Sequence, residues 1–179
     1  MLQVEMMRIN SVHQMSRDEF VSCFGEIYEE SSWVAERSYP HIKECPDWED
    51  LVQLMRNTVD GSSLGLRLAL IRAHPDLAGR AAVAGSLSEA STSEQVGAGL
   101  DQCTKREFQR FSELNTAYKS KFGFPFIVAV TGLDRHQILE QFAERLTYSK
   151  EQEFSKALEQ IHKIAHIRLD NLLDGEEGD

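Results

Sequence analysis

The sequence predicts an all-α fold: a single-domain multi-helix bundle with one short buried extended segment near residues 126–130. Helix-start signals recur along the chain, and the apolar residues after them recur every three or four positions, as on one face of a helix. Only the run 126–130 is typical of a strand. Because a lone strand leaves its backbone N–H and C=O groups unpaired, we interpret this run as a buried extended segment, with a short helix or core filler as the alternative.

Four helical elements are expected in the first half of the chain. Ser16 and Glu19 have the spacing of a capping box, in which each side chain binds a backbone N–H of the other residue, so they predict a helix start. The other expected elements are a short helix over 31–37, a helix opened by Asp47 and a helix that follows Gly61-Ser62-Ser63.

Three further helices are expected in the second half. Thr104 and Glu107 have capping-box spacing, and Gly123 is a natural C-cap for the helix that they open. Asp134 and Ser149 open the last two helices, the second of which runs to about Leu173. We expect one helical domain over 16–173, between an N-terminal arm at 1–15 and a disordered acidic tail at 174–179.

Composition narrows the class of partner and compartment. The formal net charge of −10 disfavours nucleic acid or an anionic membrane as the main partner, since both need basic patches, and no apolar run is long enough to span a membrane. Three scattered cysteines without a Cys-x-x-Cys pair favour a reducing compartment. With neither a signal peptide nor a peroxisomal address recognisable, we expect a cytoplasmic protein.

His74 is the first candidate for chemistry. It directly precedes Pro75, and proline disfavours a helical conformation in the residue before it, so one helix should end near His74 and another should start just past Pro75. Histidine is the side chain best suited to proton transfer near neutral pH. The alternative is a histidine that only satisfies backbone groups at this corner.

Glu94 is the second candidate, in the stretch Ser91-Thr92-Ser93-Glu94-Gln95. Ser91 and Glu94 have capping-box spacing, so Glu94 either caps a helix or serves a ligand at a helix N-terminus, whose free N–H groups suit an anion. Gly97 and Gly99 follow in the same expected helix. Because glycine weakens a helix, these two indicate a close approach of the backbone to another group.

Arg168 is the third candidate, because it falls within the apolar stripe of the last helix. A buried guanidinium must be paired, either with a buried Asp or Glu or with a substrate carboxylate, unless its head reaches solvent. His162 and His166 are four residues apart on the same helix but lie off the stripe, so we expect solvated side chains and no metal. No cofactor-binding motif is present, and no cofactor is expected.

Five motifs in order and with matching spacing make the chain resemble the 2-oxo-4-hydroxy-4-carboxy-5-ureidoimidazoline (OHCU) decarboxylases of urate degradation. The motifs are Ser32-Trp33-Val34-Ala35-Glu36, His74-Pro75-Asp76-Leu77-Ala78, Ser91-x-x-Glu94-Gln95 with Ala98-Gly99-Leu100, Leu114-Asn115-x-x-Tyr118 with Phe122-Gly123-Phe124-Pro125-Phe126, and Ile164-Ala165-x-x-Arg168-Leu169.

The resemblance implies a cofactor-independent decarboxylation of OHCU to S-allantoin by an all-helical protein that is usually a homodimer. It implies His74 as proton donor and Glu94 as its catalytic partner. The implied substrate contacts are Pro75, Ser91, Thr92, Ser93, Glu94, Gln95, the backbone of Phe126, Ile127, Val128, Ala129 and Val130, and Arg168. Functional coupling to hydroxyisourate hydrolase is plausible, since OHCU is unstable. The alternatives are a decarboxylase of a related ureido acid and a catalytically silent helical adaptor.

Overall fold

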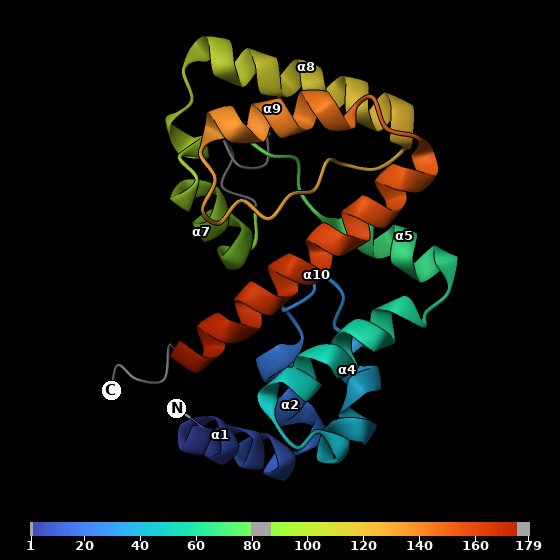
Figure 1. Ribbon diagram of the computed structural model, residues 1–179, viewed down its shortest axis with the longest axis vertical. Coiled ribbons are helices and arrows are strands. Elements are labelled where there is room, and N and C mark those ends of the chain that lie inside the picture. Colours follow the sequence, from blue (N-terminus) through green and yellow to red (C-terminus); the bar gives the residue numbers. More distant parts are fainter. Residues whose placement is uncertain (1, 80–86, 175–179) are drawn as a thin grey trace. The chain divides into compact units, whose positions relative to one another are not determined.

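The computed structural model describes residues 2–79 and 87–174, and within them the chain is helical and contains no strand (Figure 1). The all-α prediction is therefore confirmed. The helices are α1 (Leu2–Gln14), α2 (Arg17–Phe24), α3 (Trp33–Ser38), α4 (Trp48–Asp60), α5 (Leu64–Ala73), α7 (Glu89–Gly97), α8 (Lys105–Phe122), α9 (Arg135–Arg145) and α10 (Lys150–Asp174), with 3-10 helices η1 (Tyr39–Glu44) and η2 (Leu100–Gln102).

The helices form two compact units. Unit 1 contains the chain up to Ala73 and from Ala165 onward, and unit 2 contains His74–Ile164. The expected arm at 1–15 contains α1, whose Ile9 and Val12 are buried, and the tail 175–179 lies outside the described residues. The division into arm, domain and tail stays a prediction.

Unit 1 starts its helices at the residues that the sequence indicates. The Ser16 hydroxyl accepts the Glu19 N–H at 3.3 Å, and the Glu19 carboxylate accepts the Ser16 N–H at 2.7 Å, so the predicted capping box is confirmed. Asp47 caps α4 by accepting the Asp50 N–H at 3.0 Å. The helix expected over 31–37 is α3, which begins two residues later and continues into η1.

Unit 2 is arranged around α8, α9 and the first part of α10. Thr104 forms the predicted capping box of α8, and Gly123 ends that helix in the left-handed conformation, with φ of 78°. Asp134 caps α9, and Ser149 and Gln152 cap α10 reciprocally. Four fully buried aromatic side chains fill the core of this unit: Phe111, Tyr118, Phe126 and Phe142.

The segment Phe126–Val130 is buried throughout and belongs to no helix or strand, as predicted. The Phe126 ring stacks on Phe142 with 3.9 Å between the ring centroids. This packing anchors the segment in the aromatic core of unit 2.

Two predicted helix starts are wrong. No helix begins over residues 75–79, because Leu77 and Ala78 form a turn in which Ala78 has φ of 48°, a left-handed conformation that a helix cannot contain. The N-cap of α7 is Ser88, whose hydroxyl accepts the Ser91 N–H at 3.2 Å. The helix therefore starts one turn earlier than predicted, and Glu94 lies within it.

The two glycines near the end of α7 are also explained differently. A Cβ atom at Gly97 would meet nothing within 4 Å, so the expected close backbone approach is wrong there. Gly99 has φ of 72° and follows the helix end, a conformation that glycine adopts readily.

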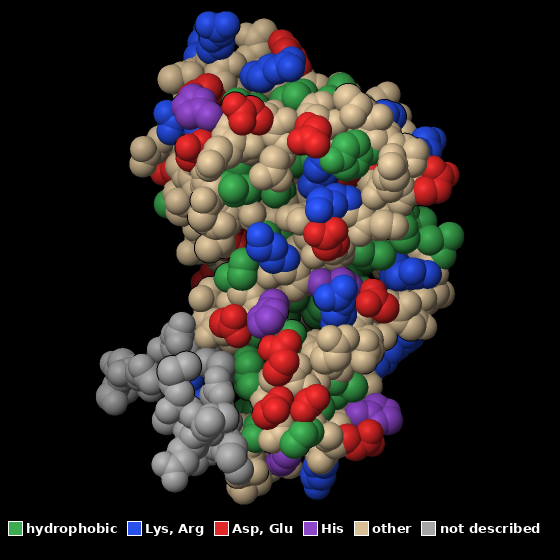
Figure 2. Space-filling view, in the orientation of Figure 1, with side chains coloured by type: hydrophobic (Ala, Val, Ile, Leu, Met, Phe, Trp, Pro, Cys, Tyr) green, Lys and Arg blue, Asp and Glu red, His purple; other side chains and the backbone are tan. Residues whose placement is uncertain are grey.

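The face shown in Figure 2 carries interspersed acidic and basic side chains. No helix in the described part of the chain is long and apolar enough to cross a membrane.

Candidate functional site

His74 is buried, with 8% of its surface exposed, and it directly follows the last residue of α5. The chain after Pro75 turns through Leu77 and Ala78. Gln95 from α7 binds this turn with both ends of its side-chain amide. Its Oε1 accepts the Ala78 N–H at 3.1 Å, and its Nε2 donates to the Asp76 carbonyl at 3.4 Å.

Two residues of α8 also bind the turn. Asn115 Nδ2 donates to the Leu77 carbonyl at 3.0 Å, and Lys119 Nζ lies 2.6 Å from the Asp76 carboxylate. The first contact is buried, whereas Lys119 is about half-exposed. Polar side chains from two helices thus hold the segment that follows His74.

The predicted substrate contacts on α7 differ in burial. Ser91 and Gln95, one helical turn apart, are buried, Glu94 is half-buried, and Thr92 and Ser93 are exposed. The side-chain amide of Gln95 is occupied by the turn, which the sequence did not indicate. The predicted partnership of His74 and Glu94 stays a prediction.

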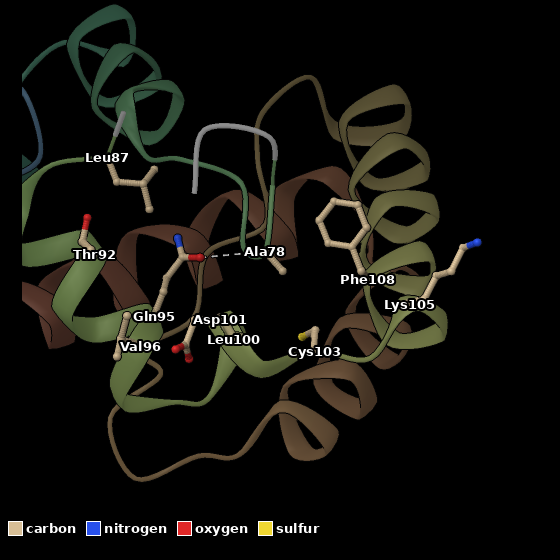
Figure 3. Close-up of a pocket in the computed structure, with 10 residues that line it drawn as sticks. All are labelled: Ala78, Leu87, Thr92, Gln95, Val96, Leu100, Asp101, Cys103, Lys105 and Phe108. Atoms are coloured by element: carbon tan, nitrogen blue, oxygen red, sulfur yellow. Dashed lines mark hydrogen bonds between the residues drawn. The ribbon is translucent and has the colours of Figure 1, made fainter. Parts of the chain in front are cut away.

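A cavity of about 530 Å³ lies beside α7, η2 and the start of α8 (Figure 3). It is lined by Ala78, Leu87, Thr92, Gln95, Val96, Leu100, Asp101, Cys103, Lys105 and Phe108. Among the predicted substrate contacts, only Thr92 and Gln95 belong to this lining. Neither His74 nor Glu94 belongs to the described lining of this cavity.

The segment 126–130 is held by side chains from α9 and α10. Arg145 donates to the Ile127 carbonyl at 2.6 Å, and the Ala129 N–H donates to Gln160 Oε1 at 3.0 Å. The Arg145 guanidinium also lies over the Phe126 ring, 4.4 Å from its centroid. These contacts fix the backbone that was predicted to meet the substrate.

Arg145 belongs to a buried charged cluster that the sequence analysis missed. Glu153 Oε1 accepts hydrogen bonds from the Arg145 guanidinium and from the Tyr118 hydroxyl, while its Oε2 has no hydrogen-bond partner among the described residues. Burial, and then the hydrogen bond to Glu153, raises the pKa of Tyr118. One feature of the sequence could have indicated that Glu153 is buried. It lies one helical turn before Ala157, which belongs to the apolar stripe of the last helix.

Arg168 is buried and has a carboxylate partner within unit 1. Its guanidinium donates to Glu29 Oε2 at 2.9 Å and, over 3.4 Å, to the carbonyls of Glu26 and Ile27. Both charged side chains are less than a tenth exposed. This geometry supports the structural ion pair, one of the two roles expected for Arg168, and substrate binding by Arg168 stays a prediction.

The expectation of two solvated histidines on the last helix is wrong for His162, which is 7% exposed. Gln160, Ile161 and His162 are all buried, and three successive residues cover about 200° of a helix, so burial here is not confined to one stripe. His166 is partly exposed and lies near Glu49 and Asp170. The described residues contain no group of three metal-ligating side chains.

Comparison with known proteins identifies relatives over nearly the whole chain. Residues 13–170 match the family model described as OHCU decarboxylase. The 2-oxo-4-hydroxy-4-carboxy-5-ureidoimidazoline decarboxylase of Halalkalicoccus jeotgali is 36% identical over 95% of this chain and 94% of that protein. The uric acid degradation bifunctional protein of Bacillus sp. (strain TB-90) is 38% identical over 93% of this chain, which spans only 32% of that protein.

A solved structure has the same fold. The crystal structure of (S)-allantoin synthase matches with a TM-score of 0.75 and 33% identity. The match covers 91% of this chain and 52% of that chain, so this chain spans about half of it. The resemblance seen in the five motifs therefore extends to the three-dimensional structure.

Proposed function

This chain belongs to the OHCU decarboxylase family, and from that premise we propose that it decarboxylates OHCU to S-allantoin in urate catabolism. The observation that carries the proposal is the family match over residues 13–170, together with a relative of that name aligned along almost its entire length. A buried histidine at a helix end, three residues before a turn held by Gln95 and Asn115, supports it.

The chemistry explains why such a site needs no cofactor. OHCU carries a carboxylate on a ring carbon next to a C=N bond. When the bond to the carboxylate breaks and CO₂ leaves, the electron pair delocalises through that C=N bond. The remaining tasks are to hold the anionic substrate and to deliver a proton to one face of the ring, which acid–base side chains can perform.

We assign the proton transfer to His74 and a supporting role to Glu94. Glu94 hydrogen-bonds the substrate hydroxyl and orients the imidazole. His74 protonates one face of the neighbouring ring carbon, which bears the ureido group and belonged to the C=N bond, while the hydroxyl on the decarboxylated carbon loses its proton and becomes the carbonyl of S-allantoin. Pro75 and the stretch 91–95 complete the contacts on this side. Within segment 126–130, the backbones of Phe126 and Val128 make no hydrogen bond with the described residues, so these are the groups that we propose to meet the substrate.

The decisive experiment follows the circular dichroism of allantoin. OHCU is generated in place from urate with urate oxidase and hydroxyisourate hydrolase, and the protein is then added. We expect a rapid S-allantoin signal from the wild-type protein and a loss of about 10²- to 10⁴-fold in rate for His74→Gln. His136→Gln, at an exposed histidine of α9, is the matched control and should behave as wild type.

Two outcomes would contradict these assignments. Slow formation of racemic allantoin with wild-type protein would remove the decarboxylase function and favour the helical adaptor, whereas turnover of another ureido acid in a substrate panel would favour the related decarboxylase. A pH–rate profile that is the same in His74→Gln and in wild type would remove His74 as the acid.

We also propose a cytoplasmic homodimer that is functionally coupled to hydroxyisourate hydrolase. The name of the Bacillus relative, a uric acid degradation bifunctional protein, supports a link between this activity and a second one in the same pathway. Light scattering tests the dimer. Coupling predicts that a smaller fraction of OHCU decays to racemic allantoin when the hydrolase makes it in the presence of the protein than when OHCU formed beforehand is added to the protein alone.

A further inference from the structure

The Leu114-Asn115-x-x-Tyr118 motif of α8 has no role in the chemistry proposed above, yet Asn115 is 5% exposed and reaches the turn behind His74. Its Nδ2 donates to the Leu77 carbonyl at 3.0 Å, a buried contact between residues 38 positions apart. A buried carbonyl needs such a donor, because burial without a hydrogen bond is costly. The contact joins α8 to the segment that carries His74.

The turn is buried at Leu77 and Ala78, and its backbone groups there are bound by side chains. Ala78 has φ of 48°, a conformation that is strained for a residue with a Cβ atom. Ala78 also lines two cavities, the 530 Å³ cavity and a second one of about 460 Å³ that Asn115 borders. Because cavities adjoin the turn on these sides, packing alone restrains it less there, and the polar contacts add to what holds it in place.

The polar contacts divide between two helices. From α7, Gln95 binds the Asp76 carbonyl and the Ala78 N–H, and from α8, Asn115 binds the carbonyl of Leu77, the residue between them. The Lys119–Asp76 ion pair, which is partly exposed, adds little by comparison. Removing Asn115 would leave the partly exposed Lys119–Asp76 pair as the contact from α8.

We infer that Asn115 is a positioning residue that holds the turn through the Leu77 carbonyl and thereby sets the direction from which His74 delivers its proton. The inference rests on the proposed function, in which His74 is the acid. It has a stereochemical consequence. A displaced imidazole protonates the ring carbon more slowly and competes less well with solvent, so both the rate and the excess of S-allantoin should fall.

The test compares Asn115→Leu, which removes the donor, with wild-type protein well below the melting temperature of either. We expect kcat to fall at least 10-fold, KM to change less than 3-fold, and the enantiomeric excess of allantoin to decrease. The excess is measured at several protein concentrations and extrapolated to saturation, so that uncatalysed product does not contribute. Gln109→Leu, at an exposed position of α8 bound only to Glu113, is the matched control.

A merely structural role gives a different result. If Asn115→Leu melts earlier but keeps the wild-type kcat and enantiomeric excess, the inference is overturned. Should that variant fail to fold, Asn115→Ala removes the donor without placing a larger side chain in the site, and the same criteria apply.

A second readout separates this inference from the proposed function. The NMR signal of the His74 Cε1 proton, followed through a pH titration, should differ between wild type and Asn115→Leu, while that of His136 should not. An unchanged His74 titration overturns the inference even if the wild-type protein makes S-allantoin. A changed titration supports it even if the wild-type protein makes only racemic product, a result that would overturn the proposed function instead.

Discussion

Among the described residues, each compact unit contains a buried arginine–glutamate pair, Arg168–Glu29 in unit 1 and Arg145–Glu153 in unit 2. Their burial is similar, since all four side chains are less than a tenth exposed. Their surroundings differ. Glu153 accepts bonds from Arg145 and Tyr118 through one oxygen, and Arg145 also donates to the Ile127 carbonyl at 2.6 Å. Arg168 donates to Glu29 at 2.9 Å and to two backbone carbonyls at 3.4 Å.

The difference shows that burial alone does not assign a function to an arginine. Arg145 binds the backbone of segment 126–130 and the Glu153 side chain of α10. Glu153 in turn accepts the Tyr118 hydroxyl of α8, so the network joins three elements of unit 2. Its partners define a structural role, which is to fix a backbone segment. Arg168 has longer bonds to the backbone, and the family resemblance assigns it to a substrate. The predictions below test whether the two pairs differ in this way.

The largest effect is expected from Glu153→Leu. It would leave the Arg145 charge buried without its carboxylate and should lower the free energy of unfolding by about 3–5 kcal/mol. The double variant Arg145→Met/Glu153→Leu should recover part of that loss, because no charge then remains buried, although the Ile127 carbonyl loses its donor. Urea denaturation measures both, and a double variant as unstable as the single one would contradict the account. Glu159→Gln, in the surface pair with Lys156, should cost at most about 1 kcal/mol.

Arg168→Ala separates the two roles of the pair in unit 1. If Arg168 binds a substrate carboxylate, KM should rise by the equivalent of about 2–5 kcal/mol. The matched variant Glu29→Gln should lower the melting temperature with little change in KM, since it leaves the arginine in place. If both variants melt early and both keep the wild-type KM in steady-state assays, Arg168 is a structural residue like Arg145.

Gln160→Leu should have a smaller effect on the segment that Arg145 holds. It leaves the buried Ala129 N–H without its acceptor, at a cost of about 1–3 kcal/mol in the free energy of unfolding. Because Arg145 still binds the Ile127 carbonyl, we expect hydrogen exchange in the variant to rise more at Ala129 than at Ile127. Equal increases at both amides would contradict this expectation and mean that the segment loosens as a unit when the Gln160 contact is lost.

A third arginine–glutamate pair, Arg135–Glu107, extends the comparison to the surface and should have the smallest effect. Hydrogen bonds lower the pKa of Glu107 from 4.5 to about 2. The largest effect comes from the Thr104 N–H and the next from the Arg135 side chain. The pKa of Glu107 is lower in the folded than in the unfolded protein. The stabilisation that ionised Glu107 gives the fold is therefore complete above pH 4.5 and is lost as the pH falls towards 2. Glu107→Gln should therefore show a shallower loss of stability over this window in urea denaturation, and a slope identical to that of wild type would contradict the assignment.

Several features could be predicted because their causes lie within a few residues. The capping boxes at Ser16 and Thr104 join residues three apart, and Pro75 acts on the residue directly before it. Where two local signals competed, the prediction was wrong, as at α7, where Ser88 and not Ser91 caps the helix. Both serines can accept the required hydrogen bond, so the local sequence did not distinguish them.

By itself, the sequence determined the all-α class, most helix starts, the buried segment 126–130 and the family. Only the tertiary structure decided which groups hold the predicted site. Asn115 meets Leu77 across 38 residues, Tyr118 meets Glu153 across 35, and Arg145 meets Ile127 across 18. Such contacts follow from how the helices of a unit pack, whereas a helix cap requires only one turn of backbone. This is why His74 could be identified from its neighbours and the residues that position it could not.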